Sequence, residues 1–192
     1  MSPRRFEQLD RRVDDLVAPW RGRPAADAVA YVASAVGDHG LIWFLIGLVR
    51  ARRPGRRRAV ALWAVLFTGA VTPVVNVVVK EGTRRGRPDP RADDPPSIRV
   101  PRTTSFPSGH ALAAWCAATL LADGDPLAPL YYVAAGAVSA SRVHVRLHHA
   151  TDVLAGAVLG VGLGRLGRRL SRPWLGRPGW GISQSAEMLA PS

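Results

Sequence analysis

Three short clusters of basic, hydroxyl, imidazole and carboxyl side chains are the part of this sequence best suited to chemistry on an anion. The first contains Lys80, Arg87 and Pro88, the second is Pro107-Ser108-Gly109-His110, and the third contains Ser141, Arg142, His148 and Asp152. Each cluster lies beside an apolar stretch. If those stretches are helices, the clusters can meet at one end of them.

A phosphate group is the anion that these residue types fit. Lys80, Arg87 and Arg142 supply fixed positive charge, and the planar guanidinium groups can hold the equatorial oxygens of a phosphoryl group during its transfer. Ser108 and Gly109 lie at the predicted start of a helix, where free backbone N–H groups favour an anion and glycine permits close approach. We predict that these five residues bind the substrate phosphate.

Two histidines and one aspartate are the candidate catalytic residues. His148 and Asp152 are four positions apart, so on a helix the carboxylate can accept from one imidazole nitrogen while the other attacks phosphorus. His110 can then protonate the leaving oxygen and later activate the water that hydrolyses a phosphohistidine. This chemistry requires no metal and no cofactor, and we predict neither.

The motif spacings resemble the signature of a known enzyme family. Lys-x6-Arg-Pro, Pro-Ser-Gly-His and Ser-Arg-x5-His-x3-Asp occur in order between Lys80 and Asp152, as in the type 2 phosphatidic acid phosphatases. That family also includes vanadium haloperoxidases and soluble bacterial acid phosphatases. The resemblance implies a helical bundle in which the three motifs have the roles given above.

Apolar segments predict the elements that position these motifs. With 192 residues the chain has room for one domain. Apolar stretches that we interpret as membrane spans lie at residues 28–49 (interrupted by Asp38, His39 and Gly40), 59–79, 111–122, 126–140 and 153–163. The third is short, and we expect its helix to start near Ser108. The sequence therefore predicts an all-α, multi-span transmembrane helical bundle with about five spans. We expect a membrane-embedded phosphatase domain over residues 28–170, a polar, Arg-rich segment over 1–27 without a cleavable signal peptide, and a tail over 171–192.

The distribution of arginine predicts an orientation in the membrane. Basic clusters follow the first and last spans, at residues 50–58 and 165–172, and such clusters resist translocation. These ends should be cytoplasmic. The polar loop at 81–106 and the motifs should then face outward from the plasma membrane of a bacterium, a source that the Ala-, Arg- and Gly-rich composition favours.

Several polar residues outside the motifs have competing interpretations. Asp38 could be functional because it lies inside a span, but a helix break explains it better. Structural hydrogen bonding is the favoured role for His39, His144 and His149, and burial as an inert thiol is favoured for Cys116. A second phosphate could contact the loop arginines, although a solvated loop is the preferred interpretation for Arg84, Arg85, Arg91, Arg99 and Arg102.

The leading expectation is a membrane lipid phosphatase that acts through a phosphohistidine. Its substrate would be an isoprenoid pyrophosphate of the undecaprenyl or decaprenyl type, or else phosphatidic acid or phosphatidylglycerol phosphate. A net charge of +12 agrees with an anionic partner. The alternatives are an inactive phosphate- or lipid-binding membrane protein, a basic nucleic-acid or membrane binder, and a haloperoxidase. The resemblance implies that haloperoxidases are larger and soluble, the nucleic-acid binder leaves the motifs unexplained, and the sequence does not indicate an oligomeric state.

Overall fold

The fold is a bundle of helices. The computed structural model describes residues 3–89 and 103–175, and all regular secondary structure in these ranges is helical, which confirms the all-α prediction. The α-helices are α1 (Pro3–Val17), α2 (Pro24–Gly37), α3 (Leu41–Ala51), α4 (Arg56–Glu81), α5 (Gly109–Leu121), α6 (Ala128–His144) and α7 (Ala150–Leu175). Two 3-10 turns, η1 (Ala18–Trp20) and η2 (Asp38–Gly40), separate α1 from α2 and α2 from α3. Residues 176–192 of the predicted tail lie outside the described ranges.

The helices agree with the apolar segments of the sequence. By length and composition, α4 and α7, with 26 residues each, can cross a membrane, and α2 with α3 makes a third span if the bent pair counts as one. The bend of 65° lies at η2, where Asp38, His39 and Gly40 were predicted to interrupt the first span. The two remaining apolar helices, α5 and α6, are shorter, with 13 and 17 residues.

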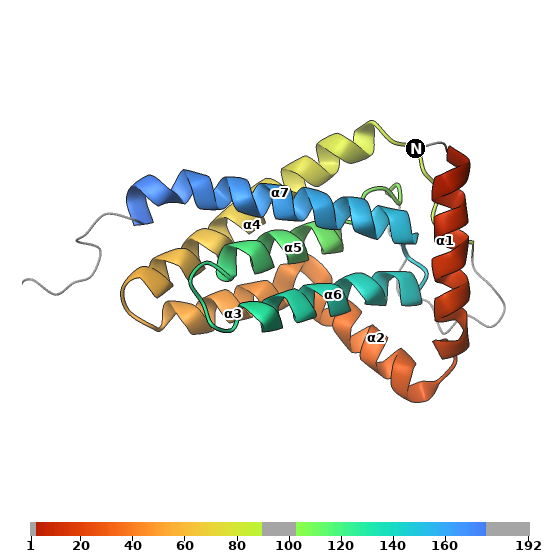
Figure 1. Ribbon diagram of the computed structural model, residues 1–192, viewed down its shortest axis with the longest axis horizontal. Helices are drawn as coiled ribbons and strands as arrows, with labels where there is room; N and C mark the ends of the chain where they lie inside the picture. Colours follow the sequence, from red (N-terminus) through yellow and green to blue (C-terminus); the bar gives the residue numbers. More distant parts are fainter. Residues whose placement is uncertain (1–2, 90–102, 176–192) are drawn as a thin grey trace, which may run out of the picture.

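Helix α5 lies at the centre of the bundle and packs closely against α7 (Figure 1). Gly156, Gly160 and Gly164 repeat every fourth residue on α7 and form the face toward α5. A Cβ atom at Gly160 would lie 2.4 Å from the carbonyl oxygen of Leu112, so only glycine lets the two backbones approach this closely. This contact fixes the start of α5 beside the start of α7, where two of the motifs lie.

The N-terminal helix α1 crosses the end of the bundle that is formed by the start of α7 and the end of α6 (Figure 1). Val13 and Val17 pack against the apolar cluster around Val143 and Val153, and Asp10 is buried on the same face of the helix. The sequence predicted only a polar segment here. The spacing of inward-facing residues shows instead an amphipathic helix that covers one end of the bundle.

Ion pairs close the opposite end of the bundle. Arg50 pairs with Asp125 and donates to the carbonyl of Leu121, while Arg56 pairs with Asp123 at 2.6 Å. Arg50 is buried, so this member of the basic cluster at residues 50–58 has a structural role in the bundle. The α3–α4 turn and the end of α7 lie at this same end, as predicted, with the motif-bearing loops at the other (Figure 1).

Candidate active site

The three motifs meet at the end of the bundle that α1 covers. Lys80 lies at the end of α4, Ser108 precedes α5, and Arg142 lies in the last turn of α6. The first and third motifs are in contact, because Arg87 donates to the carbonyl of Leu147 at 2.6 Å. The second and third motifs are also joined, because the Ser108 N–H donates to the carbonyl of Asp152 at 3.0 Å.

A tight connection between α6 and α7 places His148 beside Arg142. Arg146 has a positive φ of 53°, and this turn lets the N–H groups of Leu147 and His148 both donate to the carbonyl of Arg142 at 3.1 Å. Because α7 begins only at Ala150, the expectation that His148 lies on a helix with Asp152 is wrong. The chain must complete this turn before the next helix can start.

Asp152 is fully buried and is surrounded by donors. Its carboxylate accepts from the His149 N–H at 2.9 Å and from the hydroxyl of Ser105. The Nδ1 atom of His148 is 3.8 Å from the nearest carboxylate oxygen, too long for the direct hydrogen bond that the sequence predicted, and 3.5 Å from Ser105 Oγ. Ser105 therefore lies between the histidine and the aspartate as a bridge. The motif spacing gave no sign of this residue.

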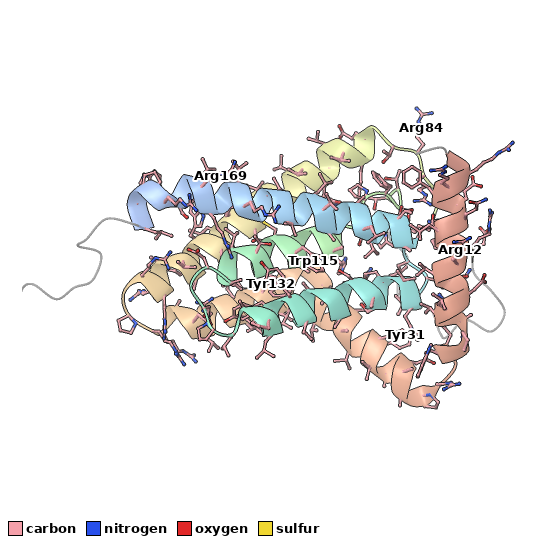
Figure 2. All side chains as sticks on the ribbon, viewed as in Figure 1. Arg12, Tyr31, Arg84, Trp115, Tyr132 and Arg169 are labelled. Atoms are coloured by element: carbon pink, nitrogen blue, oxygen red, sulfur yellow. The ribbon has the colours of Figure 1, made fainter. Side chains whose placement is uncertain are left out.

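Arg85 is a half-buried part of the site. Its guanidinium group donates to Asp152 at 2.6 Å and also pairs with Asp10, which in turn accepts from the Thr151 N–H at 2.8 Å. The prediction of a solvated loop is thus wrong for Arg85, because the loop folds back onto the start of α7. The prediction of a solvated side chain is confirmed for Arg84, which is exposed and points away from the bundle (Figure 2). The corresponding predictions for Arg91, Arg99 and Arg102 fall outside the described residues.

Asp38 joins the helix break of the first span to the site. Its carboxylate is 2.6 Å from His110 Nε2 and 3.8 Å from Arg142, whose guanidinium group also donates to Ser34. The sequence favoured a simple break at Asp38. The structure shows that the break carries the carboxylate to His110, so each of the two motif histidines has an aspartate nearby.

The cationic side chains have unused hydrogen-bonding capacity. Lys80 donates to the carbonyl of Thr104 at 2.9 Å, and Arg87 donates to that of Thr103 at 3.2 Å. Within residues 3–89 and 103–175, the Nε atoms of Arg87 and Arg142 are buried and have no hydrogen-bond partner. Buried donors without partners are costly, and an anion bound between the two guanidinium groups would satisfy them.

The start of α5 differs in one respect from the predicted phosphate cradle. Ser108 is the N-cap of α5 and accepts from the Ala111 N–H at 3.5 Å, as expected for its position. Its own N–H is occupied by Asp152, so this group is not free to bind phosphate. Gly109 lies against Asn76, and a Cβ atom there would be 3.1 Å from Asn76 Oδ1.

Burial and neighbouring cations favour the neutral form of His148. Its burial lowers the pKa to about 4; the nearby carboxylate of Asp152 opposes this shift, and the charges of Arg87 and Arg142 add to it. Burial also lowers the pKa of Arg87, whose attraction to Asp152 acts in the opposite direction. At neutral pH an unprotonated imidazole is therefore available beside two cationic side chains.

The side chains of the two other histidines near the site are hydrogen-bonded, as predicted. His144 Nε2 is 2.7 Å from Asp27, and His149 Nδ1 is 3.3 Å from Asp152. Cys116 is buried in the core, as expected. Among the described residues, no cluster of three or more His, Cys, Asp or Glu side chains is arranged to hold a metal ion.

Two cavities adjoin the site. The larger, of about 450 Å³, lies among α2, α3, α4 and α5 and reaches Gly109 and His110. Apart from its polar groups near the site, it is lined mainly by apolar side chains such as Trp43 and Phe44. The smaller cavity, of about 260 Å³, is polar and lies between α1 and the α6–α7 connection, with His148 in its wall.

Over the described residues, the fold is that of a helical integral membrane protein, with the candidate phosphate-binding residues at one end of the bundle. The profile of the PAP2 superfamily matches residues 61–174, and the chain belongs to this superfamily. This confirms the family resemblance. Two relatives named decaprenylphosphoryl-5-phosphoribose phosphatase are each 34% identical to it. The one from Mycobacterium tuberculosis aligns over 146 residues, 75% of this chain and 80% of the relative, and the one from Mycolicibacterium smegmatis covers 70% and 73%.

Two solved structures share the fold. The transmembrane PAP2-type phosphatidylglycerolphosphate phosphatase from Bacillus subtilis superposes with a TM-score of 0.70 at 22% identity, over 88% of this chain and 87% of that one. LpxE from Aquifex aeolicus superposes with a TM-score of 0.66 at 21% identity, over 81% and 93%. The arrangement of the helices is therefore that of membrane-bound members of the superfamily.

Proposed function

We propose that this protein removes a phosphate group from a lipid-linked phosphomonoester through a histidine-bound intermediate. The observation that carries the proposal is the convergence of three motifs on one end of the bundle, where His148, neutral at physiological pH, lies within the electrostatic influence of Arg87 and Arg142. Unpartnered guanidinium nitrogens on both arginines support a bound phosphate there. We assign Lys80, Ser108 and Gly109 to the same phosphate site.

In the first step, the Nε2 atom of His148 attacks phosphorus. A P–N bond forms as the P–O bond to the lipid-linked alcohol breaks, and His110, which holds its proton in the pair with the Asp38 carboxylate, gives that proton to the departing oxygen. The positive charge that develops on His148 is stabilised by Asp152 through the bridging hydroxyl of Ser105. Asp38 lies where it can hold His110 in place.

In the second step, water hydrolyses the phosphohistidine. His110, now unprotonated, accepts a proton from the attacking water while the P–N bond breaks. Inorganic phosphate leaves, and both histidines return to their starting protonation states. Arg87, Arg142 and Lys80 stabilise the charge on the phosphoryl oxygens in both steps. No residue in this scheme needs a metal ion.

The relatives suggest the first substrate to test. Their name specifies a decaprenyl chain carrying a phosphoribose, and the alignment with them covers 70–75% of this chain. We infer that a polyprenyl-phosphoryl ribose 5-phosphate is the leading candidate. Isoprenoid pyrophosphates, phosphatidic acid and phosphatidylglycerol phosphate follow. The apolar cavity beside His110 has room for the portion of lipid nearest the headgroup.

The test is phosphate release by the full-length protein in detergent, in the presence of EDTA, from this panel of substrates. We expect the wild-type protein to release phosphate and His148→Ala to lose at least about a thousandfold in rate, as expected for loss of a nucleophile. Rapid acid-free quenching with a ³²P-labelled substrate should trap label on the wild type and not on His148→Ala. Arg84→Ala, a substitution at an exposed position, serves as the matched control.

Activity that survives in His148→Ala would contradict the assigned nucleophile. Activity abolished by EDTA and restored by a divalent cation would contradict the metal-free scheme. A correctly folded wild type that binds phosphate but releases none from the panel would favour the alternative of a phosphate- or lipid-binding membrane protein without catalysis.

A further inference from the structure

The large cavity beside His110 carries a row of polar groups along one face of α4. Thr68, Thr72 and Asn76 line it, and their spacing of four residues places them above one another on the helix. The rest of the lining is mainly apolar. An otherwise apolar cavity with a few placed polar groups is typical of a site that orients a ligand.

The two threonines of the row offer acceptors to the cavity, because their hydroxyl protons already have partners. The hydroxyl proton of Thr72 is used by the carbonyl of Thr68 at 2.7 Å, and that of Thr68 points to the sulfur of Cys116 at 3.8 Å. Pro73 has no N–H, so the carbonyl of Gly69, which also lines the cavity, lacks its usual helical donor. The lone pairs that remain require a ligand that donates hydrogen bonds.

Asn76 is the polar residue of the row nearest to the motif residues. Its Oδ1 atom is buried, and no described residue donates a hydrogen bond to it. The amide lies against Gly109, where an added Cβ atom would be 3.1–3.2 Å from three of its atoms. The buried acceptor is thus placed next to the start of α5, one residue from His110, the proposed donor to the leaving oxygen.

We propose that Asn76 is a specificity-determining residue that accepts a hydrogen bond from a hydroxyl group close to the phosphate being removed. The preferred substrate then carries a polyol headgroup, such as a sugar phosphate, on its lipid. This inference rests on the proposed function and refines its substrate class. Phosphatidic acid lacks a donor at this position and would leave Asn76 Oδ1 unsatisfied, which disfavours it.

The placement also separates two kinds of recognition. The cationic groups of Arg87 and Arg142 bind the phosphate and do not discriminate between the alcohols that carry it. Asn76 lies on the His110 side of the site, where the proposed mechanism places the departing alcohol. A change at Asn76 should therefore alter the choice among phosphate esters more than the ability to cleave them.

The experiment compares two substrates that differ only in hydroxyl groups. These are a short-chain prenyl-phosphoryl ribose 5-phosphate and its 2,3-dideoxy analogue, presented to the full-length protein in mixed micelles. For wild type we expect kcat/KM to favour the hydroxylated substrate by about tenfold to a hundredfold, the usual effect of one hydrogen bond to a buried polar group. In Asn76→Leu this ratio should fall to within about twofold of unity.

Val78→Leu is the matched control, because Val78 lies on the same helix and is 63% exposed on its outer surface. It should keep the wild-type ratio. Asn76→Ala, which leaves more room in the cavity, should reproduce the collapse of the ratio if Asn76→Leu fails to fold. A wild-type ratio that persists in both Asn76 variants, or a wild type without preference, would overturn the assignment. Release from neither substrate by folded wild type would instead contradict the proposed function itself.

Discussion

The carboxylate of Asp152 accepts hydrogen bonds from parts of the chain that are distant in sequence. Ser105 reaches it from before α5, Arg85 from after α4, and Asp10 on α1 holds the far side of that arginine. A buried carboxylate needs such partners to remain ionised. The orientation of His148 therefore depends on residues that the three motifs do not contain.

Loss of Arg85 should impair the proposed catalysis without removing a motif residue. In Arg85→Ala the Asp152 carboxylate loses a charged donor, and we expect kcat to fall by about tenfold to a hundredfold, from the 1.5–3 kcal/mol that is typical of a hydrogen bond to a charged group. Arg85→Lys should recover part of the loss, because it restores the charge without the two-pronged geometry. The measurement is initial rate at saturating substrate.

Arg84→Ala is the matched control, since Arg84 neighbours Arg85 and is exposed. Equal effects of the two substitutions would mean that general loop charge, and not the contact with Asp152, is responsible. Unchanged kcat in Arg85→Ala would remove Arg85 from the site.

The protonation of His148 can be measured directly. Because the pKa of His148 is lowered to about 4 from an ordinary value near 6.5, its side chain should stay neutral when the pH is reduced to 5.5. The unfolded chain binds the proton more readily in this window, so the contribution of His148 to stability declines as the pH falls from 6.5 through 4. Imidazole NMR signals of labelled protein, with His148→Asn identifying the resonance, should show the low midpoint. A midpoint at or above 6.5 would contradict this account.

At the scale of the helices and loops, sequence patterns predicted the helices of the bundle but not all the residues that reach the site. Apolar length predicted each bundle helix, and motif order predicted that Lys80, His110 and Asp152 lie at one end. Asp38, Arg85 and Ser105 were missed as site residues because their contacts depend on how a break and a loop fold back, which spacing does not encode. The α1 helix was missed for another reason, since its inward stripe is narrow and its composition is polar.

Close packing of α5 on α7 should be sensitive to a single methyl group. In Gly160→Ala the new Cβ would lie 2.4 Å from a backbone oxygen, and neither backbone can move without shifting the start of its helix. We expect a loss of about 1–3 kcal/mol, roughly 2–12 °C in Tm for a chain of this size. Thermal unfolding in detergent measures it.

Gly162→Ala gives the comparison within the same helix, because a Cβ there would meet nothing within 4 Å. Its Tm should stay the same or rise slightly, as expected when alanine replaces glycine in a helix. If Gly162→Ala lowered the Tm as much as Gly160→Ala, contact with α5 would not be the cause of the loss.

The molecule as a whole has two chemically different ends. One end holds the proposed site and α1, and the other holds the basic α3–α4 turn and its ion pairs with the α5–α6 turn. Basic turns remain in the cytoplasm, so the site end should face outward. With Cys116 replaced by Ala, a cysteine at Arg84 should react with a membrane-impermeant maleimide in intact cells. A cysteine at Arg57 should react only after permeabilisation, and the reverse pattern would invert the orientation.

The length of α5 bears on how deep the proposed site lies in the membrane. Thirteen residues rise about 20 Å, whereas a bilayer's hydrocarbon core is about 30 Å thick. If the acidic turn after α5 lies at one membrane surface, Gly109 at its other end lies roughly 10 Å short of the opposite surface. A lipid would then have to draw its phosphate inward from the headgroup plane, and a thinner bilayer would shorten that path. Turnover in reconstituted vesicles should accordingly rise as the acyl chains of the host lipid are shortened.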